Sequence, residues 1–203
     1  MSEELPETGD GNMLIIYILA YLVFAGFFII ERFARRGKDT KNMGRTTHDR
    51  GSTSFISVVM GAAIILLPLT PLLNWAGVGM IHLVWLNILG LVLGAIGLVV
   101  RYVALTTLGR FFSRTLREAE GHTLVTTGIY HYIRHPGYLS DLLIFIGAAL
   151  AMSNLITLLV VSIGFMVAYA YRIYVEEKML IDIFGEQYRR YQKTSKRLIP
   201  FIL

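Results

Sequence analysis

Five long apolar stretches restrict the folds open to this 203-residue sequence. They span residues 13–30, 55–73, 80–100, 136–152 and 155–171. A helix needs about 20 residues to cross the hydrocarbon of a bilayer, with a range of about 17–25, so the first three are long enough and the last two are marginal. Only Ser153 and Asn154 separate those two, which predicts a tight helical hairpin. The sequence therefore predicts an all-α integral membrane protein of about five transmembrane helices.

The charged residues give this bundle a predicted orientation. Segments 31–54, 101–135 and 172–203 hold all 19 Lys and Arg, whereas residues 1–12 carry only acidic charges and the other two connections carry none. Cytoplasmic loops of membrane proteins are enriched in Lys and Arg, so we expect the N-terminus outside and the C-terminus in the cytoplasm. The net charge of +5 is thus explained by topology, and no nucleic-acid partner is expected.

The composition excludes several classes of protein. Hydrophobic residues make up 55% of the chain, charged residues 16%, and the mean hydropathy is +0.58, which excludes a disordered chain and argues against a soluble domain. The absence of Cys excludes disulfides, thiolate metal sites and a Cys nucleophile. His131 and His135 have the spacing of two ligands on one helix face, but Pro136 disfavours helical geometry at His135, so no metal site is predicted.

Two features inside the stretches bear on helix packing. Pro68 and Pro71 are expected to kink or end the second stretch. Gly90, Gly94 and Gly97 place small residues on one face of the third, which favours close approach of another helix in lipid.

Polar residues of chemical interest concentrate in segments 121–138 and 172–191. The first contains three His, one Arg, three Tyr and three Gly directly before the fourth stretch. In the second, Arg172 and Glu176 stand four residues apart and share one face of a helix. An exposed ion pair, which contributes little to stability, is the alternative interpretation of these two residues.

The second segment is predicted to form one helix that lies in or against the membrane surface. Its apolar stripe consists of Ile173, Leu180, Ile181, Phe184, Tyr188 and Tyr191. Glu177, Lys178 and Glu186 are interpreted as exposed charges. Asp141 lies about one turn into the fourth stretch, where a helix N-terminus favours an anion, and a structural role there is weighed equally with a catalytic one.

Together the two segments resemble a known family. The residues that carry the resemblance are His122-Thr123-Leu124-Val125, Gly128-Ile129-Tyr130, Arg134-His135-Pro136-Gly137-Tyr138, Arg172, Glu176-Glu177, Phe184-Gly185, Tyr188, Tyr191 and Pro200-Phe201-Ile202. In this order they are similar to the isoprenylcysteine carboxyl methyltransferase family and the wider group that includes phospholipid N-methyltransferases. The resemblance covers about residues 105–203 of a single membrane domain, whereas residues 1–104 match only as three generic spans.

The resemblance implies S-adenosylmethionine as methyl donor. The donor would lie in a cytoplasmic pocket formed by the loop before the fourth span and the helix after the fifth. The residues implied to contact it are His122, Thr123, Leu124, Val125, Tyr130, His135, Pro136, Gly137, Tyr138 and Glu176. Arg172 would bind the methyl acceptor, and Arg172, Glu176 and Arg134 are the predicted catalytic residues. Gly137 replaces a Ser that is frequent in the eukaryotic pattern, which leaves the backbone contact in place.

The residue types suit methyl transfer to a carboxylate. The reaction is an in-line displacement that needs alignment, and an ionised carboxylate needs no strong base. An Arg holds a carboxylate by two parallel hydrogen bonds, which a Lys does not do. We therefore predict methyl transfer to a lipophilic acceptor that enters from the bilayer, with the carboxylate of an isoprenylcysteine-like substrate as the leading candidate.

Other functions remain open from the sequence. An amine or thiol acceptor, including a phospholipid amine, is one alternative; an amine would need a base such as Glu177 or Asp141. A sterol-type reductase that uses NADPH is a second. A scaffold or small transporter is a third, although the stretches contain almost no ionisable residue. The predicted location is the inner or plasma membrane of a prokaryote or the endoplasmic reticulum of a eukaryote, with the active site facing the cytoplasm.

Overall fold

In the part of the chain that the computed structural model describes, residues 9–35, 50–81, 83–109 and 124–199, the regular secondary structure is helical apart from two isolated β-bridges. Its helices are α1 (Gly9–Arg35), α2 (Ser52–Trp75), α3 (Val84–Leu108), the 3₁₀ helix η3 (Gly128–His131), α4 (Pro136–Ala151), α5 (Leu155–Phe184) and α6 (Glu186–Thr194). The predicted all-α class is confirmed.

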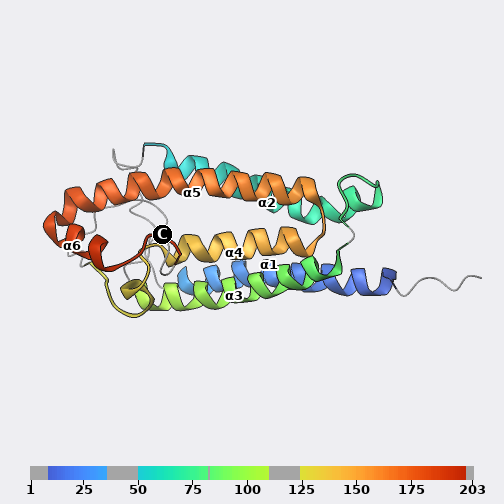
Figure 1. The fold of residues 1–203 in the computed structure, drawn as a ribbon, viewed down its shortest axis with the longest axis horizontal. Coiled ribbons are helices and arrows are strands. Elements are labelled where there is room, and N and C mark those ends of the chain that lie inside the picture. Colours follow the sequence, from blue (N-terminus) through green and yellow to red (C-terminus); the bar gives the residue numbers. More distant parts are fainter. Residues whose placement is uncertain (1–8, 36–49, 82, 110–123, 200–203) are drawn as a thin grey trace, which may run out of the picture.

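The long helices run roughly parallel or antiparallel in one elongated bundle (Figure 1). Helix α4 packs between α3, α1 and α5, and α2 packs along α5. The end of α1, the start of α2, the end of α3, η3, the start of α4 and α6 all lie at the same end of the bundle, which we call the basic end (Figure 1). Each of the three segments that hold the basic residues, 31–54, 101–135 and 172–203, therefore has described residues at this end.

Among the described residues, four helices are long and apolar enough to cross a membrane, and they are α1, α2, α3 and α5. Helix α4, predicted as the fourth of five spans, has 16 residues and is about 24 Å long at 1.5 Å per residue. Most of its residues from Ile144 to Ala151 are buried against neighbouring helices. A short helix in this position is covered by protein more than by lipid.

Helix α2 continues through Pro68 and Pro71, so the expectation that a proline could end it is wrong. One backbone carbonyl of α2 is hydrogen-bonded by a neighbouring helix: the Tyr21 hydroxyl of α1 donates to the Pro68 carbonyl at 3.0 Å. The Thr70 hydroxyl donates to the Leu66 carbonyl at 3.0 Å. Both hydrogen bonds lie beside the prolines, although neither uses the carbonyl of Ile64 or Leu67 that a missing proline N–H leaves without its helical partner.

The glycines of α3 allow its close contact with α4, as predicted. A Cβ added at Gly97 would lie 2.9 Å from the backbone nitrogen of Ile144, and one added at Gly147 of α4 would lie 2.7 Å from the Gly90 carbonyl oxygen. Gly94 instead faces Val23 of α1. Small residues on both helices therefore let the two backbones touch.

The hairpin between α4 and α5 is as tight as predicted. Ser153 adopts a left-handed φ of 51°, and the Asn154 side chain caps α5 by accepting a hydrogen bond from the Thr157 amide at 3.0 Å. Asn154 also donates to the Asn74 side chain at 2.8 Å, which fixes the turn to the end of α2. This end of the bundle lies opposite the basic end (Figure 1).

Helix α5 runs 30 residues, well past the predicted span end at residue 171. It stops at Gly185, whose φ of 53° is easily adopted only by glycine, and α6 begins directly afterwards. The prediction of one helix over 172–191 is therefore wrong at this position. The break turns α6 back toward the loop that precedes α4 (Figure 1).

Candidate functional site

The loop before α4 is held by the chain that follows α6. The Arg134 amide donates to the Lys196 carbonyl at 2.8 Å, the His135 amide to the Arg197 carbonyl at 3.2 Å, and the Lys196 amide to the Tyr132 carbonyl at 2.9 Å. His135 itself has non-helical φ and ψ angles of −123° and 56°, as expected before a proline. His131 ends η3 and His135 precedes α4, so the two do not share one helix face.

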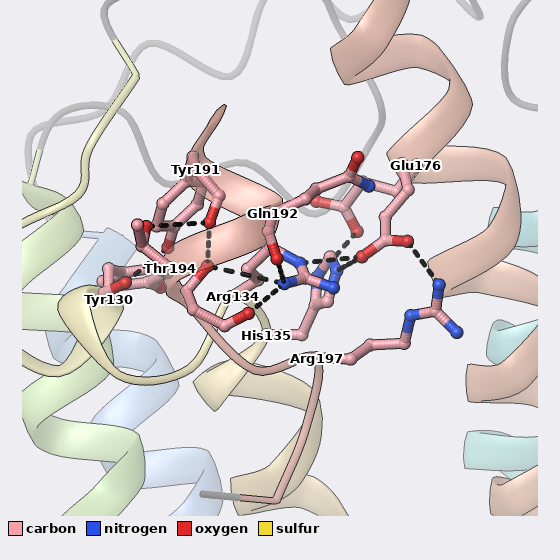
Figure 2. A network of polar contacts seen from close by, with 10 residues as sticks. Tyr130, Arg134, His135, Glu176, Tyr191, Gln192, Thr194 and Arg197 are labelled. Atoms are coloured by element: carbon pink, nitrogen blue, oxygen red, sulfur yellow. Dashed lines mark hydrogen bonds and ion pairs between the residues drawn. The ribbon is translucent and has the colours of Figure 1, made fainter. Parts of the chain in front are cut away.

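Helix α6 packs on this loop with its two tyrosines. Tyr188 and Tyr191 are buried, and the Tyr191 hydroxyl donates to the Tyr130 carbonyl of η3 (Figure 2). Burial raises the pKa of Tyr191 to about 12, so this hydroxyl stays protonated near neutral pH. The prediction that these members of the stripe face the membrane surface is wrong, because they face the protein.

Glu177 of α5 is the centre of a buried ion cluster. Its Oε1 accepts from Arg134 Nε at 2.9 Å and lies 3.3 Å from His135 Nε2, and its Oε2 accepts from Arg197 Nη2 at 2.8 Å. The Glu177 side chain is only 7% exposed. Its interpretation as an exposed charge is therefore wrong: it ties α5 to the loop and to the chain after α6.

Arg134 is fully engaged in that cluster. Besides Glu177, its Nη1 donates to the Gln192 carbonyl at 3.2 Å and to the carbonyl of Ser195 (Figure 2). Only 8% of its side chain is exposed. These contacts join the end of α6 to the loop before α4. Arg134, which the sequence placed among the catalytic residues, therefore makes contacts that position these two segments.

A second set of contacts joins α4, α5 and α2. The Tyr138 hydroxyl donates to Glu176 Oε2 at 2.5 Å and accepts from Arg172 Nε at 3.1 Å. Arg172 Nη1 also donates to the hydroxyls of Ser52 and Thr53, both at 2.8 Å, at the start of α2. Arg172 is buried, so the interpretation of Arg172 and Glu176 as an exposed ion pair is wrong.

Four stacked rings connect this set to the interior. The His135 and Tyr138 rings are nearly parallel with centroids 5.5 Å apart, and the Tyr138 and Tyr169 rings are stacked at 4.9 Å. Tyr169 in turn stacks on Phe165 at 5.6 Å. The Tyr138 hydroxyl is therefore fixed in place by ring packing as well as by its hydrogen bonds.

Glu176 keeps one oxygen available. Its side chain is 23% exposed, and its contacts with Tyr138 and with His135 Nδ1, 3.8 Å away, both involve Oε2. Within the described ranges no hydrogen-bond donor reaches Oε1. A carboxylate oxygen in this state can receive a cationic or hydroxyl-bearing ligand.

The remaining predicted donor-binding residues fall at the same end of the bundle. Leu124 and Val125 lead into η3, which contains the half-buried Tyr130. Pro136 and Gly137 form the first turn of α4, and a Cβ added at Gly137 would meet only an Arg101 nitrogen at 3.5 Å, so a Ser would fit there. His122 and Thr123 lie outside the described residues.

Sequence reasoning missed a buried triad. Arg101 and Glu31 were assigned to connecting segments, but α3 and α1 extend past them, and both are buried. Arg101 pairs with Glu31 and, at 3.0 Å, with Asp141 Oδ1, and the Tyr169 hydroxyl donates to Asp141 Oδ2 at 2.6 Å. These contacts favour the structural role considered for Asp141. The available signal was that each missed charge directly follows an apolar stretch.

Known proteins resemble the region that contains these contacts. Residues 88–182 match the isoprenylcysteine carboxyl methyltransferase family. The Protein-S-isoprenylcysteine O-methyltransferase of Tribolium castaneum is 33% identical over 126 residues, which cover 61% of this chain and 45% of that protein. The protein of the same name from Saccharomyces cerevisiae is 36% identical over 119 residues, covering 57% and 49%. The chain therefore spans about half the length of these curated relatives.

The similarity extends to a solved fold. A structure of the eukaryotic intramembrane Ras methyltransferase ICMT aligns with a TM-score of 0.59 and 25% identity, over 91% of this chain and 68% of that one. The family match begins within α3 and ends near the end of α5, so it contains the loop before α4, Arg172, Glu176 and Glu177. Residues 88–182 are thus the part of the chain that is similar to the isoprenylcysteine carboxyl methyltransferase family.

Proposed function

We propose that this protein is a membrane methyltransferase that transfers a methyl group from S-adenosylmethionine to the carboxylate of an isoprenylcysteine-like acceptor. The observation that carries the proposal is the buried chain of contacts from Arg172 through Tyr138 to Glu176. It joins the two segments that carry the family resemblance, and both lie in the matched region. Curated relatives over this region are named protein-S-isoprenylcysteine O-methyltransferases.

The chemistry of Glu176 fits a cationic donor. S-adenosylmethionine, when bound, supplies the methyl group from a sulfonium and also carries an ammonium group. The open Oε1 of Glu176 offers a negative charge to such a ligand, while Tyr138 holds Oε2 and so fixes the carboxylate. The loop residues His122 to Val125, with Tyr130, His135, Pro136 and Gly137, would bind the rest of the donor.

Arg172 fits the acceptor carboxylate. Ser52 and Thr53 at the start of α2 and Tyr138 of α4 hold its guanidinium, so its orientation is set before a substrate arrives. A preorganised guanidinium can align a carboxylate by charge-assisted hydrogen bonds. The lipid tail of the acceptor would remain among the apolar helices, and the soluble donor would reach the basic end from the cytoplasm.

The structure also bears on the choice of acceptor atom. An amine acceptor needs a base, and Glu177 and Asp141 were the candidates. Glu177 is engaged by Arg134, His135 and Arg197, and Asp141 by Arg101 and Tyr169. Strongly paired carboxylates are poor bases, because their cations stabilise the ionised form. A carboxylate acceptor needs no such base, so this pairing favours it over an amine.

Calorimetry on the purified protein tests the donor. We expect S-adenosylmethionine and S-adenosylhomocysteine to bind, and NADPH not to bind. Binding of NADPH in place of the adenosyl compounds would support a reductase and overturn the proposal.

Acceptor comparison tests the second half of the proposal. Arg172→Ala should abolish most methyl transfer to a prenylated cysteine with a free carboxylate. Equal losses for carboxylate and amine acceptors would contradict the role given to Arg172.

A further inference from the structure

The buried triad of Glu31, Arg101 and Asp141 lies next to the proposed site without being part of it. Arg101 of α3 stands between the carboxylate of α1 and that of α4, and the three side chains are at most 7% exposed. The Arg101 guanidinium also lies over the Phe27 ring of α1, 5.3 Å from its centroid. Burying three charges costs solvation free energy unless geometry and hydrogen bonds are good, so a buried set of this kind marks a functional constraint.

Two routes lead from the triad toward Tyr138, one through the first turn of α4 and one through Tyr169 of α5. Arg101 Nη1 donates to the Gly137 carbonyl at 3.2 Å, and Asp141 accepts from the Tyr169 hydroxyl at 2.6 Å. The Tyr169 ring stacks on Tyr138. Backbone and ring contacts therefore run from Arg101 to the residue whose hydroxyl joins Glu176 and Arg172.

One member of the triad comes from a helix that the family match does not include. Glu31 lies in α1, and the match begins at residue 88. Because Arg101 pairs with Glu31 and Asp141 together, α1 and α4 are held at one spacing by the same guanidinium. Helix α1 thus contributes the Glu31 carboxylate next to the site, whereas α2 contributes the Ser52 and Thr53 hydroxyls.

We propose that Arg101 is a positioning residue, anchored by Glu31 and Asp141, that sets the first turn of α4 and through it the place of Tyr138 and His135. The effect of this positioning on catalysis rests on the proposed function, since Tyr138 fixes the Glu176 carboxylate that is proposed to bind the methyl donor. Loss of the triad then loosens donor binding and alignment, while Arg172, held by α2, keeps the acceptor in place.

The test replaces the whole triad. Arg101→Met alone leaves two buried carboxylates facing each other and would unfold the protein, whereas a complete buried ion set can often be replaced by uncharged residues without loss of the fold. In the variant E31Q/R101M/D141N we expect the donor Kd to rise about tenfold or more and kcat to fall by up to about 100-fold, with little change in the KM of the acceptor. A folded triple variant with wild-type donor Kd and kcat would overturn the proposal.

Two further measurements separate positioning from general stability. Arg101→Lys keeps the charge but not the planar fork that serves Glu31, Asp141 and the Gly137 carbonyl together. The Lys variant should therefore bind the donor more tightly than the triple variant but less tightly than the wild type. Full restoration by Lys would contradict the role given to the fork. A purely structural triad would lower the melting temperature and leave the donor Kd of the folded protein unchanged.

Because the chain has no cysteine, spin labels can be attached at two introduced cysteines alone. The distance between the labels then reports how α1 and the loop before α4 are placed, without donor or acceptor. Ile29 of α1 and Tyr132 of the loop are both exposed and suit Ile29→Cys and Tyr132→Cys. We expect the distance distribution between the labels to broaden in the triple variant, and an unchanged distribution would overturn the proposal. A wild-type protein that binds no donor would instead overturn the proposed function, while the label distances still test the positioning.

Discussion

Glu176 and Glu177 are neighbours in sequence but belong to different regions of the structure. Glu177 is buried, and Arg134, His135 and Arg197 together engage both of its oxygens. Glu176 is more exposed, and Tyr138 and His135 approach only one of its oxygens. The same type of side chain therefore stabilises the fold at position 177 and stays available to a ligand at position 176.

The difference follows from helix geometry. Consecutive residues of a helix point about 100° apart, so Glu177 faces the loop before α4 and the chain after α6, while Glu176 faces Tyr138 and the Arg172 side. A carboxylate surrounded by cations is a structural anchor. One with an open oxygen beside a preorganised Arg is the better candidate for binding, and the following substitutions test this division.

The largest effect is expected for Glu177→Ala. The substitution leaves the buried Arg134 without its carboxylate, and breaking a buried pair in this way costs about 3–5 kcal/mol. The melting temperature in detergent should fall steeply. Glu176→Ala is the matched control, and equal melting temperatures for the two variants would remove the distinction between them.

Glu176→Ala should act on the donor and not on the fold. A hydrogen bond to a charged group contributes about 1.5–3 kcal/mol, which corresponds to about a 10- to 100-fold rise in the Kd for S-adenosylmethionine. Calorimetry at a temperature where the variant is folded measures it. An unchanged Kd would mean that the open oxygen does not meet the donor.

Arg172→Lys should weaken the acceptor step. Lys keeps the positive charge but does not reach Tyr138, Ser52 and Thr53 together or hold a carboxylate by two hydrogen bonds. We expect kcat/KM for a carboxylate acceptor to fall about tenfold, with the donor Kd nearly unchanged. Arg189→Lys, at an exposed position of α6, is the control for the substitution itself. A matching loss in donor affinity would show that Arg172 serves the donor instead.

The smallest effect is expected for Tyr138→Phe. The ring keeps its stacking on His135 and Tyr169 but loses the hydroxyl that joins Glu176 to Arg172. Losing a hydrogen bond of about 1 kcal/mol corresponds to roughly a fivefold rise in the donor Kd. Tyr174→Phe removes an exposed hydroxyl on the same helix as Glu176 and should leave the donor Kd unchanged.

The helices and the placement of Arg172 and Glu176 on one helix face could be predicted because both depend on local periodicity. A four-residue spacing places two side chains on one face wherever the helix lies. The hairpin at Ser153 and Asn154 was equally local. These features needed no knowledge of distant parts of the chain.

The role of Glu177 depends on distant partners. His135 precedes it by 42 residues and Arg197 follows it by 20, so no local pattern separates it from an exposed glutamate. The buried triad was missed for a related reason. An apolar stretch is taken to end at its first charge, but Glu31 and Arg101 neutralise each other inside helices that continue beyond them. Pairing between helices is invisible when each helix is considered alone.

Methyl transfer itself tests the central claim most directly. Purified protein is incubated with isotopically labelled S-adenosylmethionine and a prenylated cysteine that has a free carboxylate, and the product is analysed by mass spectrometry before and after mild base. We predict a labelled methyl ester that base hydrolyses, which is formed by the wild type and nearly lost in Glu176→Ala. Label on a nitrogen or sulfur atom, or no labelled product from wild-type protein that binds the donor, would contradict the account.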